Sequence, residues 1–266
     1  MLAAARQSEI IQHVRRHGTA RISDLASALG VSEMTIRRDV DSLASDALLQ
    51  KVHGGVMVVG RLSTDEPGFE KKSIRQEAEK GAIAREAATF IAPGSAIGLS
   101  AGTTTWTLAK TIAKVNGLTI VTNSIHVAEV FYREAASNTS VRNAVILTGG
   151  QRTPSDALVG PIAISALAQL HLDVLFLGVH GIDDHAGFTT PNILEAETDQ
   201  AFVRSARRVV VLADHTKWGT VGMSTIAPLS EVQAVISDDL LPDDAQLRLS
   251  EAVPELRIAR VNRENS

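Results

Sequence analysis

The apolar residues of the first 45 positions recur at helical spacing. Residues 6–17 predict one helix, and residues 22–29 predict a second helix that stops at Gly30. A third helix is expected after Ser32, a good N-cap residue, and its apolar stripe consists of Ile36, Val40 and Leu43. A helix, a short turn and a capped helix have the spacing of a helix-turn-helix.

Two short β-like segments follow, residues 47–52 and 56–59, joined at His53-Gly54-Gly55. A Gly-Gly pair tolerates positive φ at both central turn positions and favours a hairpin, which would be the wing of a winged helix. Residues 60–80 mix glycine, proline and charges, which is typical of a linker. That linker is expected to run into a helix over residues 74–92.

From about residue 90, short Val/Ile/Leu-rich strands alternate with helical stretches, which predicts an α/β fold with a parallel sheet covered on both faces. The expected strands are residues 96–100, 118–122, 144–148, 174–179, 208–213, 234–237 and 257–261. The predicted organisation has three parts: a winged helix-turn-helix over residues 1–59, a linker and helix start over 60–80, and an α/β domain over 81–266.

Composition supports a folded protein and narrows its chemistry. Of 266 residues, 44% are hydrophobic and none is cysteine, which excludes disulfides, thiolate metal sites and cysteine nucleophiles. We find no signal peptide and no apolar run long enough to span a membrane, so a cytoplasmic location is expected. The net charge of −4 divides into +1 for residues 1–60 and −5 for the remainder, which suits a small binding module on an acidic domain.

The third helix carries candidate DNA-binding chemistry on the face opposite its apolar stripe. Thr35, Arg37, Arg38 and Asp41 lie there. Arginine binds guanine edges or phosphates, and threonine hydroxyls reach bases or phosphates. The alternative is that both arginines are ordinary solvated charges on a surface helix.

A second candidate site follows the strand expected at residues 96–100. Small residues make the turn, and a helix begins near Thr103 with three consecutive threonines. Free N–H groups at a helix N-terminus, next to hydroxyls, can hold a phosphate. A plain threonine-capped turn would explain the same residues.

Further polar clusters follow other expected strands, at residues 122–124, 148–150, 180–183 and 214–217. Because ligands of open α/β sheets bind outside the carboxyl ends of the strands, these clusters are expected to converge, although each alone could be turn chemistry. The histidines are scattered without a metal-binding spacing, so no metal site is predicted.

The stretch from Arg6 to Val56, with VSEMTIRRDVDSL and then VHGG, resembles the DNA-binding domain of the DeoR-type family of bacterial sugar-metabolism repressors. It departs at Ala47, where the family has glycine, and at Lys51, where it has arginine. The resemblance and the helix pattern together give these predicted DNA-binding residues: Arg6, Ser32, Thr35, Arg37, Arg38, Lys51 and His53.

Residues 69–240 resemble the effector domain of the same family through Glu79-Lys80, AGTTT, TNS, TGG, GID, GFTT, EAE and ADHTK. Such domains are similar to ribose-5-phosphate isomerase and sense phosphorylated sugars. Two departures are Ser100 and His180, where the family and the isomerase, respectively, have aspartate. The predicted ligand-binding residues are Ser100, Gly102, Thr103, Thr104, Thr105, Thr122, Asn123, Gly149, Gly150, His180, Asp183, Glu195 and Lys217.

The resemblance therefore implies a transcriptional regulator, with a repressor favoured, controlled by a phosphorylated sugar or related metabolite. Loss of one carboxylate at His180 favours binding without turnover, because sugar isomerisation needs both an acid and a base. The alternative is a sugar-phosphate isomerase with a DNA-binding head. The expected partners are double-stranded operator DNA, a sugar-phosphate effector and further copies of the chain; neither a cofactor nor a membrane is expected.

Overall fold

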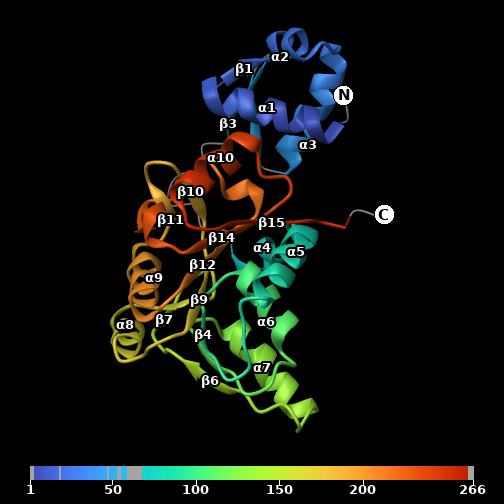
Figure 1. Cartoon of the computed structure of the whole chain (residues 1–266). Coiled ribbons are helices and arrows are strands. Elements are labelled where there is room, and N and C mark those ends of the chain that lie inside the picture. Colours follow the sequence, from blue (N-terminus) through green and yellow to red (C-terminus); the bar gives the residue numbers. More distant parts are fainter. Residues whose placement is uncertain (1–2, 18, 47, 53–54, 59–67, 263–266) are drawn as a thin grey trace. The chain divides into compact units, whose positions relative to one another are not determined.

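The computed structural model describes residues 3–17, 19–46, 48–52, 55–58 and 68–262 (Figure 1). The chain divides into two compact units, Met1–Leu62 and Ser63–Ser266, called here the head and the body. Each unit has apolar core clusters of its own.

The described part of the head combines helices with a small antiparallel sheet of strand order β1-β3-β2. Its elements are α1 (Ala3–His17), β1 (Thr19–Arg21), α2 (Ile22–Leu29), α3 (Glu33–Ser45), β2 (Leu49–Val52) and β3 (Gly55–Val58). This order confirms the predicted winged helix-turn-helix. Two residues on which sequence expectations rested, Ala47 and His53, lie outside the described residues.

Two glycines allow the head to close around its core. Gly30 ends α2 in the left-handed region, at φ 64°, and its N–H group bonds to the Ala26 carbonyl. At the start of β3, a Cβ atom on Gly55 would lie 2.5 Å from the Ala20 carbonyl oxygen of β1, so no side chain fits there. The enclosed side chains include Ile10, Leu25, Ile36, Leu49 and Val56.

The body is built on a seven-stranded sheet of order β15-β14-β12-β9-β4-β5-β6, parallel throughout. Its strands are β4 (Ala96–Leu99), β5 (Thr119–Thr122), β6 (Ala144–Leu147), β9 (Val174–Gly178), β12 (Val209–Leu212), β14 (Ala234–Asp238) and β15 (Leu256–Ala259). All seven were predicted from short apolar runs. Such runs mark strands that are buried on both faces.

Helices cover both faces of this sheet, as Figure 1 shows. One core cluster joins the sheet to α5 (Glu77–Ala88), α6 (Thr103–Ile112) and α7 (Ile125–Ser137). The other cluster joins the sheet to α8 (Pro161–Leu167), α9 (Ile193–Ser205) and α10 (Asp243–Ala252). This is the α/β architecture that the alternation of strands and helices predicts.

Several small elements were not predicted. A second, antiparallel sheet contains β10 (Gly181–Asp183), β11 (Gly187–Thr190) and β13 (Ser224–Ala227). A hairpin joins β7 (Gln151–Arg152) to β8 (Leu158–Val159), and short 3-10 turns lie at η1 (His215–Lys217) and η2 (Leu229–Glu231). Segments of two to four residues show no periodicity, and distant pairing decides whether they become strands.

The helix expected over residues 74–92 is divided and begins earlier. A short α4 (Phe69–Ser73) precedes α5, and Gln76 between them adopts φ 51°. The ring of Phe69 stacks on His126 of α7 at 3.8 Å between centroids and meets Trp106 of α6 edge-on at 5.5 Å. Packing of this aromatic ring against two other helices therefore fixes α4 in its own direction.

Candidate DNA-reading helix and effector site

The second helix of the helix-turn-helix, α3, begins at a side-chain cap. The Ser32 hydroxyl accepts a hydrogen bond from the Thr35 N–H group at 3.2 Å, and the two hydroxyls lie 2.9 Å apart. This cap satisfies one of the free amides of the first turn. Ser32 and Thr35, both predicted DNA-binding residues, are therefore neighbours at the start of α3.

The two faces of α3 differ as the sequence pattern predicts. Ile36, Val40 and Leu43 are buried in the head core, whereas Arg37 and Arg38 are exposed. Arg37 lies 3.3 Å from Glu33 one turn earlier, and both side chains are more than half exposed. Such exposed pairs contribute about 0.3–0.5 kcal/mol, too little to keep Arg37 from a DNA phosphate or base.

Arg6 lies elsewhere in the head, in an ion pair with Asp39 of α3. Its Nε atom donates to Asp39 Oδ2 at 2.5 Å and a terminal nitrogen donates to Oδ1 at 3.2 Å. Asp39 is only 5% exposed. The pair holds α1 against the inner side of α3, so Arg6 helps to position α3.

Lys51 of β2 lies at the edge of the same helix, paired with Asp41 of α3. Both side chains are more than half exposed, so this pair joins the wing to α3 without burying either charge. The pairing leaves the Lys51 ammonium open to solvent.

In the body, the loop after β4 lies at the point where the strand order reverses. The chain continues from β4 to β5 and β6 on one side, and places β9, β12, β14 and β15 on the other. The carboxyl ends of β4 and β9 therefore flank the topological switch point, the usual ligand position of such sheets. Ser100 spans the two strands, because its hydroxyl accepts a hydrogen bond from the Gly178 N–H group at 2.9 Å.

Side chains hold the loop from Ser100 to Thr105 in a fixed shape. Asn123 Oδ1 accepts from the Ala101 N–H group at 2.7 Å, and the Thr105 hydroxyl donates to the carbonyls of Ser100 and Gly102. All three threonines that open α6 are buried. Gly102 occupies the N-cap without a side chain, so it leaves the first amides of α6 uncapped.

A buried ammonium, Lys80, is a candidate ligand residue that the sequence interpretation did not include. Lys80 is 4% exposed, and its Nζ donates to the carbonyls of Lys72 and Arg75 at 2.5 Å each. Burial lowers the pKa of Lys80 to about 8, and the nearby carboxylate of Asp214 acts in the opposite direction. The available signal was a lysine on the apolar stripe of α5, in register with Ile83, Ala84 and Ala87.

Asp214 links Lys80 to the predicted ligand residue Lys217. It is 2% exposed and caps η1 by accepting the Thr216 N–H group at 3.0 Å. Burial alone would raise the pKa of Asp214, but the charge of Lys217 and the hydrogen bond from Thr216 lower it overall. An ionised Asp214 therefore lies within electrostatic range of both lysines.

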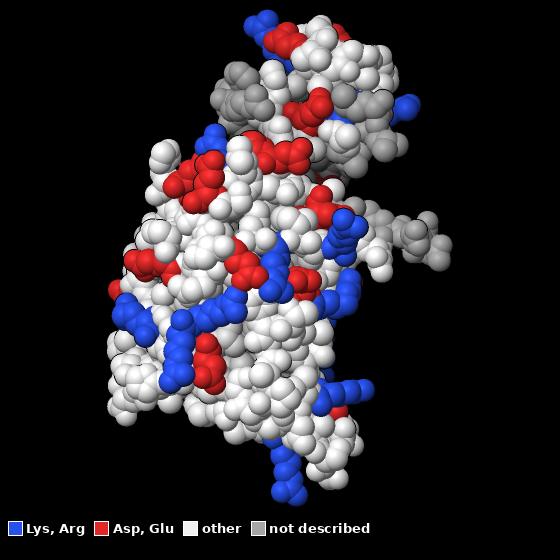
Figure 2. Space-filling view, viewed as in Figure 1, with Lys and Arg blue, Asp and Glu red and all other residues white. Residues whose placement is uncertain are grey.

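This local charge matters because the body carries no continuous basic surface on the face shown in Figure 2, where Lys and Arg alternate with Asp and Glu. A phosphate approaching the loop would depend on nearby groups, namely the two ammoniums and the free amides of α6.

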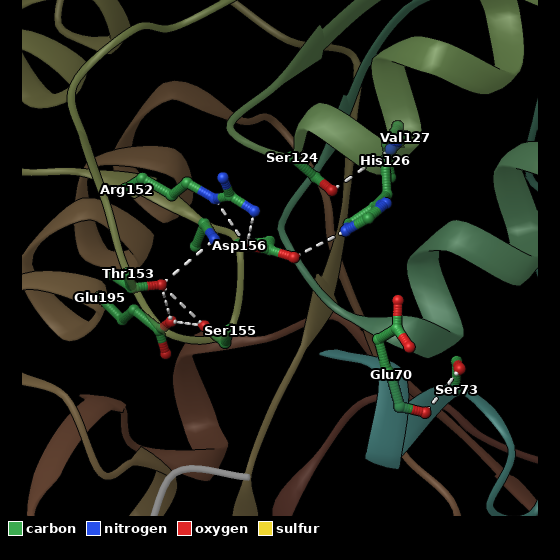
Figure 3. Close-up of polar contacts among 11 residues, drawn as sticks. Glu70, Ser73, Ser124, His126, Val127, Arg152, Thr153, Ser155, Asp156 and Glu195 are labelled. Atoms are coloured by element: carbon green, nitrogen blue, oxygen red, sulfur yellow. Dashed lines mark hydrogen bonds and ion pairs between the residues drawn. The ribbon is translucent and has the colours of Figure 1, made fainter. Parts of the chain in front are cut away.

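Glu195, at the capped N-terminus of α9, has both carboxylate oxygens engaged, and Figure 3 shows the contacts of one of them with Ser155 and Thr153. Its Oε1 accepts from Ser155 and, at 3.2 Å, from Thr153 of the β7–β8 hairpin, and its Oε2 accepts from Thr190 at 2.9 Å. Glu195 therefore ties the hairpin to α9 and β11. The same hairpin is held from the other side by Asp156, 2.8 Å from His126 Nε2.

The remaining predicted ligand residues contribute to the frame of the site. Thr122 donates a hydrogen bond to the Leu99 carbonyl at 2.6 Å. Gly150 lies against Val159, because a Cβ atom on Gly150 would be 2.5 Å from the Val159 carbonyl oxygen.

Asp183 closes the β10–β11 turn by accepting the N–H groups of His185 and Ala186 at 2.9 Å. The His180 N–H group bonds to the Thr189 carbonyl. Gly149 precedes the hairpin and has φ 71°.

Asp199 is expected to make the stability of the body depend on pH. It lies one turn after Glu195 on α9, and burial, then the neighbouring charge of Glu195, raises the pKa of Asp199 well above its ordinary value. Above about pH 4 the unfolded chain loses this proton while the native chain retains it, so the free energy of unfolding falls as pH rises toward the native pKa. Asp199→Asn should therefore raise the melting temperature at pH 7.5 more than at pH 4.5.

Differential scanning calorimetry at the two pH values measures this effect. Glu197→Gln, an exposed acid on the same helix, is the matched control and should give equal shifts at both pH values. An Asp199→Asn variant that parallels this control would show that Asp199 ionises in the native protein.

Comparison with known proteins assigns both units. A family model described as a DeoR-like helix-turn-helix domain matches residues 6–61, and one described as the DeoR C-terminal sensor domain matches residues 75–239. The chain thus combines a DNA-binding head with a small-molecule sensor. It belongs to the DeoR family of helix-turn-helix transcriptional regulators, as the sequence motifs predict.

Curated relatives align along nearly the whole chain. An HTH-type transcriptional regulator GlpR of Haloferax volcanii is 34% identical, over 95% of this chain and 96% of its own length. The HTH-type transcriptional repressor CsqR of Escherichia coli K12 is 31% identical, over 94% of each chain. A putative aga operon transcriptional repressor of Escherichia coli O157:H7 is 30% identical, over 94% and 92%.

Some solved structures match part of the chain at low identity. Ribose-5-phosphate isomerase A of Neisseria gonorrhoeae matches 55% of each chain at 15% identity, with a TM-score of 0.38. A translation initiation factor eIF-2B of Pyrococcus horikoshii matches 60% of this chain and 62% of its own at 14% identity, with a TM-score of 0.41. The family assignment and the relatives' names confirm a regulator rather than an enzyme.

The described residues contain no group of three or more His, Asp or Glu residues arranged to hold a metal ion. No helix among them has the length and apolar character needed to cross a membrane.

Proposed function

We propose that this DeoR-family regulator is a repressor of carbohydrate-metabolism genes, controlled by a phosphorylated sugar that binds the body. The observation that carries the proposal is the loop from Ser100 to Thr105 at the switch point of the sheet, near the buried Lys80 and Asp214. Relatives named as repressors favour repression as the mode of regulation.

In the head, α3 enters the major groove of operator DNA with its N-terminal turns toward the base edges. Arg37 and Arg38 contact bases or phosphates, Thr35 contacts a neighbouring base or phosphate, and Lys51 and His53 contact the backbone from the wing. Ser32 orders the first turn of α3 as its cap. Arg6 acts through Asp39, by holding α3 in place.

In the body, the effector's phosphate binds the amides and hydroxyls of Gly102, Thr103, Thr104 and Thr105. Lys217 and Lys80 supply the compensating positive charge. Ser100 and Asn123 keep the loop in shape through their bonds to Gly178 and Ala101.

The sugar end of the ligand extends toward the polar groups around the hairpin. Glu195 and Asp183 are the acceptors for sugar hydroxyls, and His180 lies between β9 and β10, three residues before Asp183. Thr122, Gly149 and Gly150 shape the adjoining wall. Glu195 would exchange its bonds to Ser155 and Thr153 for bonds to the ligand, which couples binding to the hairpin.

The regulator acts as a homo-oligomer. One small head makes few base contacts, and two heads on a symmetric operator add both affinity and specificity.

Two measurements on the full chain test the proposal. Selection from random double-stranded DNA should enrich one sequence with two related half-sites. A thermal-shift screen with pairs of sugars, each with and without phosphate, should raise the melting temperature only for phosphorylated members, because a ligand that binds only the native state stabilises it. Absence of any enriched sequence overturns the DNA assignment. Shifts independent of the phosphate overturn the effector assignment, and isomerised product would favour the enzyme alternative.

A further inference from the structure

Several exposed apolar side chains of the body gather at one end of the large sheet. They belong to β6, the terminal strand, and to the adjacent starts of α7 and α8 (Figure 1). Their exposed fractions are 37% for Ile125, 55% for Tyr132, 40% for Ile146, 39% for Leu147 and 68% for Ile162. These five residues are called here the edge patch.

The backbone of β6 has one bonded side and one outward side. The N–H groups of Ala144 and Thr148 bond to the carbonyls of Leu118 and Thr122, in β5 and just before it. Because backbone groups alternate in direction along a strand, the even-numbered residues of β6 direct their N–H and C=O groups to β5. The N–H and C=O groups of Val145 and Leu147 therefore point away from the sheet. No strand of the described residues pairs with that side.

The edge patch is apolar on both faces of the sheet. Ile146 is aligned with Val121, which belongs to the core on the α8 side, whereas Val145 packs on the core that includes α7. Because side chains alternate along a strand, Ile146 faces the α8 side and Leu147 the α7 side.

The flanking helices extend both faces. On the α8 side, Ile162 lies close to Gly149, which follows Leu147 by two residues. A Cβ atom built on Gly149 would lie 3.4 Å from Cγ2 of Ile162. On the α7 side, Ile125 and Tyr132 are seven residues apart and share one flank of that helix. The opposite flank carries His126, which stacks on Phe69 toward α6, so Ile125 and Tyr132 lie toward the edge of the sheet.

We propose that β6 pairs with β6 of a second copy of this chain, in antiparallel orientation around a two-fold axis at Ile146. In this register Val145 of each copy bonds to Leu147 of the other, and the two Ile146 side chains meet as a non-hydrogen-bonded pair. The sheets of the two copies become continuous. The inference rests on the self-association proposed above and names the surface that provides it.

Three properties favour a second copy over another occupant. An edge strand of sequence Ala-Val-Ile-Leu has none of the charges, prolines or bulges that normally block pairing. A helix of another protein could cover the apolar side chains on only one face of the sheet, whereas the β6 edge of a second copy covers those on both faces. The two-fold arrangement also brings the two copies of Ile146 together at the axis, so each copy covers the same exposed side chain of the other.

The surface area is compatible with a stable dimer. The edge patch exposes on the order of 400 Å² of apolar surface, the size of the largest apolar patch on a typical monomer, and such patches are often functional. A standard interface takes about 800 Å² from each partner, and the β6 backbone with the polar rim of α7 would provide the remainder.

The first experiment compares the association of full-length variants by sedimentation equilibrium. Ile146→Lys places two like charges opposite each other at the axis, and Leu147→Lys places a charge against the apolar Val145 of the other copy on the other face. Together the two substitutions should raise the dissociation constant at least about 100-fold. The matched control, Ile74→Lys with Leu247→Lys, changes two residues that are 80% and 61% exposed elsewhere and should associate like the unmodified chain. Thermal unfolding of each variant reports whether its body folds.

The second experiment does not depend on the lysine variants. The chain has no cysteine, so Ile146→Cys introduces a single thiol at the proposed axis. Mild oxidation should join two such chains by a disulfide, because opposed residues of a non-hydrogen-bonded pair lie within disulfide range. Leu247→Cys should remain unlinked.

The outcomes separate the two proposals. An unmodified chain that stays monomeric overturns self-association and this interface together, while operator selection still tests DNA binding. A chain that associates, keeps its affinity in the lysine variant and fails to link through Ile146→Cys overturns the edge assignment alone. Loss of association in the lysine variant, with linkage through Ile146→Cys, supports it.

Discussion

Arg38→Ala is expected to weaken binding of the full chain to its selected operator by about 1–3 kcal/mol, or roughly 5- to 150-fold. Arg38 is exposed on the outer face of α3, whose inner face packs on the head core through Ile36 and Val40. Truncating Arg38 removes a guanidinium without disturbing that packing. A gel-shift titration measures the change.

The salt dependence of binding distinguishes the kind of contact that is lost. If Arg38 binds a base, discrimination against substituted operators falls with the affinity. If it binds a phosphate, all sequences weaken alike and the slope of log K against log salt falls by about 0.9. Arg204→Ala, an exposed arginine of α9, is the control, and an Arg38→Ala variant that binds like this control would exclude Arg38 from the interface.

Lys217→Met is expected to weaken binding of the phosphorylated effector by about 1.5–3 kcal/mol, or roughly 10- to 150-fold, because a charge-assisted hydrogen bond is lost. Binding of ligand-free protein to DNA should not change, since Lys217 belongs to the body. Isothermal titration calorimetry with the sugar phosphate identified by thermal shift gives the affinity. Lys114→Met, an exposed lysine on the same domain, controls for the change in net charge.

The same titration is repeated at several pH values, because burial lowers the pKa of Lys80 to about 8. The Lys80 ammonium is charged below that value and neutral above it, while a phosphate monoester remains dianionic above pH 7. Effector affinity should therefore fall between pH 7 and pH 9.5. Lys80→Arg keeps its charge across this range and should remove the fall; a fall that persists in this variant would mean that another group titrates.

The family and the fold class can be recognised from the sequence alone, because short local patterns of residues identify both. The stripe of Ile36, Val40 and Leu43, the Ser32 cap and Gly30 lie within 14 residues of chain, and all seven strands of the large sheet appear as apolar runs. The polar groups at strand ends were also predictable, because chain direction in a parallel sheet brings those ends to one edge.

Pairings between distant residues were decided only by the tertiary structure. The strand order placed Ser100 beside Gly178, 78 positions away, and that contact defines the switch point. The partner of Arg6, Asp39, lies 33 positions away on the inner side of α3. Neither partner has a signal in its own neighbourhood of the sequence.

The sequence by itself determined the two units, the strands of the large sheet and the type of chemistry at each strand end, because side-chain periodicity and capping act over a few residues. Tertiary structure decided which charges are buried and with what partners. Lys80 shows the difference: its helix was predicted, but its lowered pKa arises from burial, which the nearby carboxylate of Asp214 opposes. Desolvation depends on everything that surrounds a group in space, and chain order does not encode it.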